Sequence, residues 1–217
     1  MPPRLPDALR TALRPVRRRV RPTQVERRLA AVGLRPGDVA IDCGANVGHV
    51  TIELARFGAE IHAFEPNPDA FAALERRAGV LPNVHVHQLA VLDHDGSVRL
   101  YLHKRTSEDP LRWSTAASLL PFKWNVDADA WVVVEAIDLA RFVLELGRPV
   151  KLMKIDVEGV EHAILNRLID SGAIDRIGLV YVEVHDPHVP ELREKTELLR
   201  DRLHEEGLEG KVRTDWV

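Results

Sequence analysis

A glycine-rich turn is the first part of the chain whose residue types and spacing suit ligand chemistry. Residues 40–50 read AIDCGANVGHV, so Gly44 and Gly48 follow a short apolar run and Asn46 lies between them. A turn of this kind after a strand commonly holds a nucleotide at the start of a helix. Asn46 suits such a turn because asparagine enters the left-handed backbone region more readily than most residues. The stretch therefore predicts a ligand-binding turn.

The neighbouring residues argue against two phosphate-bearing ligands. No Gly-Lys-Ser/Thr follows the turn, which excludes a P-loop for nucleoside triphosphates. The dinucleotide fingerprint G-x-G-x-x-G would put His49 at its third glycine, where a histidine is too large for close packing of helix and strand. Asp42 ends the preceding predicted strand, and its charge would repel a pyrophosphate. The remaining motif, D-x-G-x-N-x-G, suits a ligand with a cationic amine or sulfonium.

A second acidic residue narrows the choice of ligand. Glu65 ends the next predicted strand, 21 residues after Gly44. A carboxylate in this place can accept hydrogen bonds from both hydroxyls of a ribose. A ligand with a ribose and a positive charge but no phosphate matches both Asp42 and Glu65. S-adenosylmethionine (AdoMet) fits that description.

Two later strands end in polar residues that could do acid–base chemistry. KLMKID leads into Asp156 and Glu158, and IGLVYVEVH contains Glu183 and His185. A central parallel strand is expected to be apolar on both faces, so these side chains need a partner or a function. We expect them to line the pocket for a methyl acceptor, with His185 or Asp156 as the general base. Asp156, Glu183 and His185 could also hold a divalent cation that acidifies the acceptor hydroxyl.

The elements that must position these residues alternate along the chain. Strands are predicted at 39–42, 60–64 and 84–91, with helices at 47–57 and 69–78 between them. This order is typical of a parallel, doubly wound sheet. A capping box at Thr23 and Glu26 predicts an earlier helix that ends at Gly33. Further along the chain we expect strands at 97–104, 132–136, 151–156 and 177–185. We expect helices at 138–146, 161–172 and 191–206, after which the chain is long enough for one last strand.

Three motifs in order resemble the FkbM-type methyltransferases: IDCGANVGHVTIELA, FEPNP and KIDVEGVEHAIL, within residues 35–186. Members of that family are AdoMet-dependent, and many methylate hydroxyl groups of natural products or sugars. The resemblance implies an α/β, Rossmann-like class I fold whose doubly wound sheet is mostly parallel, with a β-hairpin and loop inserted before the fourth strand. The residues that it places around the donor are Asp42, Gly44, Asn46 and Gly48 at the methionine part, Glu65 at the ribose, and Gln88, Leu89 and Ala90 at the adenine.

The chain also departs from the family's usual pattern. It ends soon after KVRTDWV, whereas family members continue into a final antiparallel pair of strands. We therefore expect a shortened C-terminal sheet edge, which would favour a homodimer. The aperiodic stretch 103–131 contains Trp113, Trp124 and Trp131, and we expect this long loop to close over the acceptor.

Composition bounds the remaining expectations. The chain has 217 residues, a net charge of −3 and a single cysteine, which predicts one globular domain at 23–217 without internal disulfides. No apolar run approaches the length of a membrane span, and no secretory signal precedes the first helix, so a cytoplasmic location is expected. Residues 1–22 form a basic, Pro/Arg-rich tail that could touch an anionic surface, without a strong signal for nucleic acid.

The function predicted from these residues is AdoMet-dependent methylation of a hydroxyl on a small molecule, sugar or natural product. Two alternatives stay open. One is an NAD(P)-dependent Rossmann oxidoreductase, which His49 and Asp42 oppose. The other is a non-catalytic protein of the AdoMet-binding fold that acts through its basic tail, which the acids at the strand ends oppose.

Overall fold

The computed structural model describes residues 23–185 and 189–216, so the predicted basic tail at 1–22 lies outside the described residues. In the described part, six strands form a central sheet in the order β3-β2-β1-β7-β8-β9, and all neighbours are parallel. Their bounds are β1 Val39–Cys43, β2 Glu60–Phe64, β3 Val84–His87, β7 Val150–Ile155, β8 Ile177–Val182 and β9 Val212–Arg213. The predicted doubly wound sheet is confirmed, and its order reverses between β1 and β7, where such folds bind ligands.

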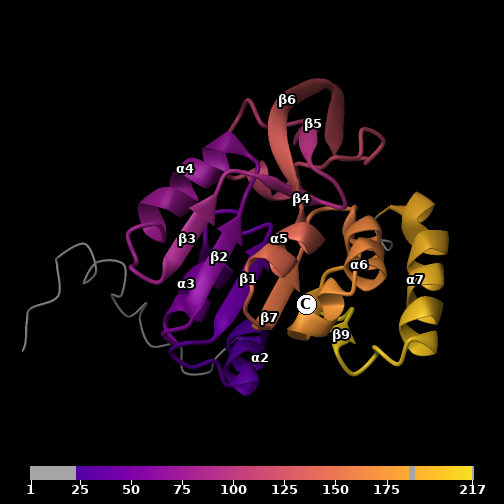
Figure 1. Ribbon diagram of the computed structural model, residues 1–217. Helices are drawn as coiled ribbons and strands as arrows, with labels where there is room; N and C mark the ends of the chain where they lie inside the picture. The colour runs from indigo at the N-terminus through magenta and orange to yellow at the C-terminus, as the bar shows by residue number, and fades with distance from the viewer. Residues whose placement is uncertain (1–22, 186–188, 217) are drawn as a thin grey trace, which may run out of the picture.

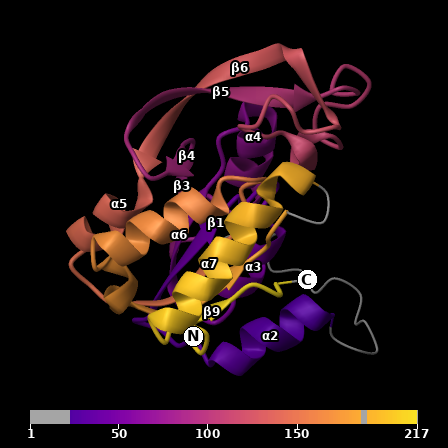
Figure 2. The same cartoon turned by 90° about the vertical axis from the view of Figure 1, so that its right-hand side faces the viewer.

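Helices cover both faces of this sheet (Figures 1 and 2). One layer consists of α2 Gln24–Val32, α3 His49–Ala55 and α4 Pro68–Arg77, and the other of α5 Leu139–Glu145, α6 Glu161–Asp170 and α7 Arg193–Glu205. Side chains alternate between the layers along a strand, so Ala40 packs with the first layer and Ile41 with the second. The predicted capping box of α2 is confirmed, and Gly33 ends that helix with a left-handed φ of 65°.

A second sheet stands above the carboxyl ends of the central strands, at the end of the molecule opposite α2 (Figure 1). It consists of β4 Ala90–Leu92, β6 Val126–Asp138 and β5 Gly96–His103, in the order β4-β6-β5, with β5 and β6 antiparallel. Leu92, Leu100 and Val134 lie in the apolar cluster of this sheet. The predicted hairpin and loop before the fourth central strand are thus confirmed, although β6 is much longer than the predicted strand at 132–136.

Two strand predictions need correction. The strand expected at 84–91 is broken at Gln88: β3 ends at His87, whose carbonyl accepts a hydrogen bond from Glu65 N at 3.0 Å, and β4 joins the other sheet. The strand expected at 177–185 ends at Val182, so Glu183 and His185 lie in the segment after it. Both predictions failed because a run of strand-forming residues does not show which sheet its residues join or where pairing stops.

The remaining elements are short. Three 3₁₀ helices are described, namely η1 Ser114–Ala116, η2 Ala173–Arg176 and η3 Pro190–Leu192. The C-terminal edge strand β9 has two residues and pairs in parallel with β8, which agrees with the expected short edge. No helix in the described ranges combines the length and the apolar character needed to span a membrane.

Candidate active site

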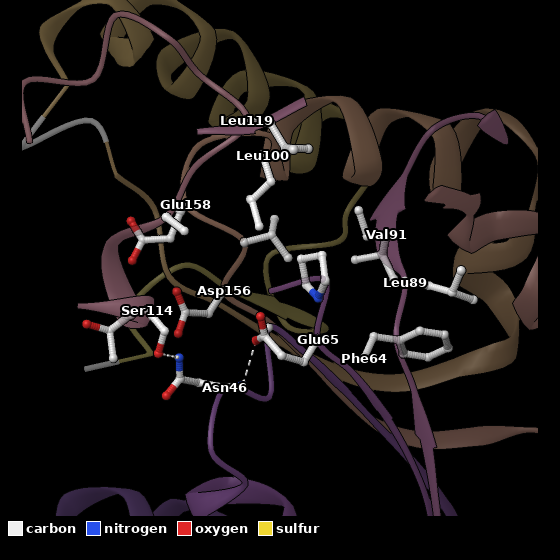
Figure 3. Close-up of a pocket in the computed structure, with 16 residues that line it drawn as sticks. Asn46, Phe64, Glu65, Leu89, Val91, Leu100, Ser114, Leu119, Asp156 and Glu158 are labelled. Carbon is white, nitrogen blue, oxygen red and sulfur yellow. Dashed lines mark hydrogen bonds between the residues drawn. The ribbon is translucent and has the colours of Figure 1, made fainter. Parts of the chain in front are cut away.

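A cavity lies where the central strands β1, β2 and β7 end beneath the second sheet (Figure 3). The space within its lining is about 670 Å³, including space open to solvent. Polar and apolar groups divide its wall. The polar side chains are Asn46, Glu65, Ser114, Thr115, Asp156 and Glu158, and the apolar ones include Phe64, Leu89, Ala90, Val91, Leu100 and Leu119.

The glycines of the first turn bring the backbone into close contact with other elements. Gly44 has a φ of 74°, and a Cβ atom there would lie 1.8 Å from the carbonyl oxygen of Asp156. Gly48 has a φ of 85°, and its Cβ would lie 2.9 Å from Leu74 on α4. Asn46 adopts the expected left-handed conformation with a φ of 47°. Gly44 and Asn46 reach the cavity wall, whereas Gly48 packs behind it.

Glu65 fastens this turn to the end of β2. Its Oε2 atom accepts a hydrogen bond from Asn46 N at 2.8 Å, and its Oε1 atom accepts one from Asn67 N at 2.8 Å. Burial raises the pKa of Glu65 to about 7, although the backbone N–H groups of Asn67 and Asn46 favour the charged form. The side chain thus presents a carboxyl group to the cavity that is sensitive to pH near neutrality.

Asp42 occupies a different place from the one expected. It is fully buried and absent from the cavity wall, and its Oδ2 atom accepts a hydrogen bond from Thr51 Oγ1 at 2.7 Å. Lys154 Nζ lies 3.5 Å from Asp42 Oδ1 and 3.1 Å from Asp156 Oδ2, and it donates to Gly44 O at 2.8 Å. Burial alone would lower the pKa of Lys154, but the charges of Asp156 and Asp42 raise it. Asp42 therefore helps to hold Lys154, and Lys154 in turn donates a hydrogen bond to the glycine turn at Gly44 O.

Asp156 and Glu158 line the cavity, and the imidazole of His185 lies behind them. His185 Nε2 is 3.2 Å from Glu158 Oε2 and 3.7 Å from Asp156 Oδ1, and its Nδ1 atom is 3.0 Å from Glu161 Oε1. Burial would lower the pKa of His185, but the carboxylates of Glu161, Glu158 and Asp156 raise it to about 9. A raised pKa favours the protonated imidazole, which suits an ion pair with these carboxylates better than the role of general base.

Glu158 is held in a strained backbone conformation by the inserted loop. Its φ of 63° is unusual for a residue with a side chain. Lys123 forms an ion pair with its carboxylate, and Ser118 Oγ donates a hydrogen bond to its carbonyl oxygen at 2.6 Å. Burial raises the pKa of Glu158, while the charges of His185 and Lys123 act in the opposite direction.

The inserted loop supplies site residues that the sequence patterns missed. Lys123 and Ser118 hold Glu158, and Ser114 Oγ accepts a hydrogen bond from Asn46 Nδ2 at 2.9 Å. Lys123 lies between two aromatic residues in an aperiodic stretch. No sequence pattern therefore indicated that it would contact Glu158, 35 residues later. The serine-rich run at 114–118 was the available signal, since polar residues of a long loop commonly contact a ligand or its pocket.

Three other predicted site residues are placed as follows. Ala90 lines the cavity, whereas Gln88 is exposed and does not. Glu183 follows β8, and its backbone N–H donates to Ile155 O at 2.9 Å. The side chain is half-buried, and burial, with the charge of Asp156, raises its pKa. Glu183 does not line the cavity but stands close enough to influence its acids.

The expected cation ligands are only partly brought together. Among the described residues, Asp156, Glu158 and His185 form a group whose ligand atoms all lie within 4.8 Å of one another, and Glu183 is outside it. Lys154 already contacts the carboxylate of Asp156, and Lys123 contacts that of Glu158. A divalent cation would have to displace these ammonium groups and the imidazole proton, so the group fits a metal poorly.

Comparisons with known proteins show the family to which the chain belongs. Residues 42–209 match the family model of the methyltransferase FkbM domain. The 31-O-demethyl-FK506 methyltransferase FkbM of Streptomyces tacrolimicus is 32% identical over 179 residues, which is 71% of this chain and 68% of that protein. The 2-O-methyltransferase NoeI of Sinorhizobium fredii is 25% identical over 171 residues, which is 74% of this chain and 70% of that protein.

A solved structure, that of precorrin 8w decarboxylase from Methanobacterium thermoautotrophicum, aligns with a TM-score of 0.45 and 18% identity, over 84% of this chain and 73% of that one. The family match begins at the acid of the glycine turn and contains the wall residues from Gly44 to Glu158. The chain belongs to the FkbM family of methyltransferases.

Proposed function

We propose that this protein transfers a methyl group from AdoMet to a hydroxyl of a small molecule, sugar or natural product. The observation that carries the proposal is one cavity with Glu65 on one side and the acids Asp156 and Glu158 on the other. The names of the two FkbM-family relatives, a 31-O-demethyl-FK506 methyltransferase and a 2-O-methyltransferase, both refer to oxygen as the acceptor atom.

The wall chemistry fits the parts of AdoMet in turn. Phe64, Leu89 and Val91 offer an apolar surface for the flat adenine ring. Each oxygen of Glu65 accepts one backbone hydrogen bond, which leaves further acceptor positions for the two ribose hydroxyls. The carboxylates of Asp156 and Glu158 favour the positively charged sulfonium and ammonium groups.

When bound, AdoMet supplies an electrophilic methyl group, and in-line attack by the acceptor oxygen breaks the carbon–sulfur bond and leaves S-adenosylhomocysteine. The acceptor hydroxyl must also lose its proton. We assign proton acceptance to Glu158, because burial makes its carboxylate more basic and it faces the cavity. The cations of Lys123 and His185 hold that carboxylate in position. The role of general base, predicted for His185 or Asp156, is thus assigned to Glu158 in this proposal, with His185 as a positioning residue.

The inserted loop would exclude water from the reaction. Ser114, Ala117 and Leu119 form part of the wall, and the loop is attached at the glycine turn and at Glu158. Bringing acceptor and donor together in a closed cavity lowers the entropic cost of the reaction and keeps water away from the methyl group.

Two experiments test the proposal. Thermal unfolding is followed with AdoMet, S-adenosylhomocysteine and NAD, all at the same concentration. A ligand present at a hundred times its dissociation constant stabilises by about 2.7 kcal/mol, which raises the unfolding temperature by roughly 5–10 °C for a chain of this size. A shift with NAD alone would favour the oxidoreductase and overturn the proposal.

The second experiment measures S-adenosylhomocysteine formation over a panel of hydroxylated acceptors. Glu158→Gln should lower turnover by about 10²–10⁴-fold and leave the dissociation constant of S-adenosylhomocysteine within a few-fold. Glu75→Gln, an exposed change on α4, is the matched control. Full turnover by Glu158→Gln would remove Glu158 from the proton transfer.

A further inference from the structure

A second hollow lies beside the proposed donor cavity, between α4 and the inserted loop. Asn46 and Thr115 belong to the walls of both. The hollow encloses about 720 Å³, including space open to solvent. Ala73 and Leu111 give it apolar patches. The hydrogen bond from Asn46 to Ser114 lies where the two spaces adjoin, so a group held in the hollow would stand next to the glycine turn.

Two guanidinium groups give this hollow a positive character. Arg77 Nη1 donates to Val47 O at 2.6 Å, and its Nη2 atom lies 3.4 Å from His49 Nδ1. The guanidinium of Arg112 lies 5.1 Å from the ring centroid of Trp113. Across residues 23–185 and 189–216, neither arginine forms a salt bridge with a carboxylate.

The remaining polar groups of the hollow do not cancel these charges. Asp109 is its single acid among the described lining residues, and its Oδ1 atom accepts a hydrogen bond from Arg112 N at 3.0 Å. Burial and the charge of Arg77 lower the pKa of His49, which favours its neutral imidazole. Two cations against one anion leave a positive hollow adjoining a cavity whose wall carries three carboxyl groups, those of Glu65, Asp156 and Glu158.

We propose that this basic hollow, defined by His49, Arg77 and Arg112, binds an anionic group that lies beside the methyl donor during the reaction. The group is a carboxylate, phosphate or sulfate, which the fork of a guanidinium recognises through parallel hydrogen bonds. It belongs either to the amino-acid end of AdoMet or to an anionic acceptor. This inference rests on the proposed function, because it names a second recognition site for the same reaction.

The separation of charge supports this assignment. AdoMet carries a sulfonium, an ammonium and a carboxylate group, so a site that binds it must accommodate charges of both signs. The acids of the cavity attract only the sulfonium and the ammonium. The hollow is open, with Leu111 41% exposed beside Arg112, so an anionic group of a ligand could reach both arginines from the side of the loop.

The test uses isothermal titration with three probes at low ionic strength. S-adenosylhomocysteine carries the amino-acid carboxylate, 5′-methylthioadenosine lacks that end, and inorganic phosphate stands for an acceptor anion. The variants are Arg112→Gln, Arg77→Gln and both together, and Arg76→Gln, an exposed neighbour on α4, is the matched control. Because Arg77 also donates to Val47 O, Arg112→Gln keeps the test valid if Arg77→Gln unfolds.

Two outcomes support the proposal. If the hollow holds the donor's carboxylate, the double variant weakens S-adenosylhomocysteine by about tenfold or more and leaves 5′-methylthioadenosine unchanged. If it holds an acceptor anion, both nucleosides bind unchanged, and phosphate binding to the wild type, with and without S-adenosylhomocysteine, is lost in the variants.

Unchanged affinity for all three probes would overturn the proposal, as would equal weakening by Arg76→Gln. Failure of the wild type to bind either nucleoside would instead overturn the proposed function, and the phosphate titration would still decide whether the hollow binds anions.

Discussion

Glu65→Gln is the substitution that tests the donor site most directly. The glutamine keeps the size of the side chain but replaces one acceptor oxygen by an NH₂ group, which can only donate hydrogen bonds. In the wild type both oxygens accept backbone hydrogen bonds, from Asn46 N and Asn67 N, and both are proposed to accept ribose hydroxyls. The variant therefore loses the negative charge and at least one ribose contact.

The expected magnitude follows from these contacts. A hydrogen bond to a charged group contributes about 1.5–3 kcal/mol, and a loss of about 1.4 kcal/mol is a tenfold change in affinity. The dissociation constant of S-adenosylhomocysteine should therefore rise about 10- to 100-fold. One backbone amide also loses its acceptor, so we expect the variant to unfold with about 1–3 kcal/mol less stability.

The pH dependence provides an independent check. Free Glu65 has a pKa raised to about 7 by burial, and two hydroxyl donors in the bound state favour the ionised form. Affinity should therefore be highest above pH 7 and fall by up to about tenfold per pH unit below it. Glu65→Gln should remove this dependence, and Glu75→Gln should keep it. The reasoning is refuted if titration calorimetry gives the variant a dissociation constant within twofold of the wild type.

Three further predictions concern folding and metal. Gly44→Ala should cost at least about 3 kcal/mol in urea unfolding, because its Cβ would lie 1.8 Å from Asp156 O. Gly172→Ala, with a φ of 72° and nothing within 4 Å, should cost only about 1 kcal/mol. The pKa of His185 is raised to about 9, so its stabilisation is present below pH 6.5 and lost as pH rises through 9. His185→Gln should flatten that part of the stability curve. Dialysis against a chelator should leave S-adenosylhomocysteine formation unchanged, and recovery of lost activity on adding Mg²⁺ would contradict our assignment of Glu158.

The central layer of the fold was predictable from local patterns. Apolar runs of strand length alternate with helical periods, and the capping residues Thr23 and Gly33 mark the ends of the first described helix. The glycine turn was also predictable, because Gly44 and Asn46 need left-handed backbone that few other residues adopt easily. These signals depend on a few neighbouring residues, so no tertiary information was needed.

The parts that failed depend on contacts between distant segments. After His87 the chain leaves the central sheet, and Ala90–Leu92 join the second sheet; periodicity contains no information about this change of sheet. The ion pair of Lys123 with Glu158 joins a loop to a strand end. An isolated lysine in an aperiodic stretch has no spacing that indicates its partner. Asp42 was expected to face the ligand, but it is buried beside Lys154. An acidic residue at a strand end looks the same in the sequence whether it faces a ligand or a lysine.

The placement of Asp42 changes the electrostatic argument for a cationic donor. Its charge is opposed by Lys154 inside the protein, so it contributes little attraction at the cavity. Lys154 also contacts Asp156, and Lys123 contacts Glu158. Glu65 differs from Asp42, Asp156 and Glu158. It accepts backbone hydrogen bonds and forms no salt bridge with any described residue. Under the proposed function, selectivity for a ribose-bearing cation would therefore depend mainly on Glu65, a carboxyl group whose ionisation the bound ligand itself would promote.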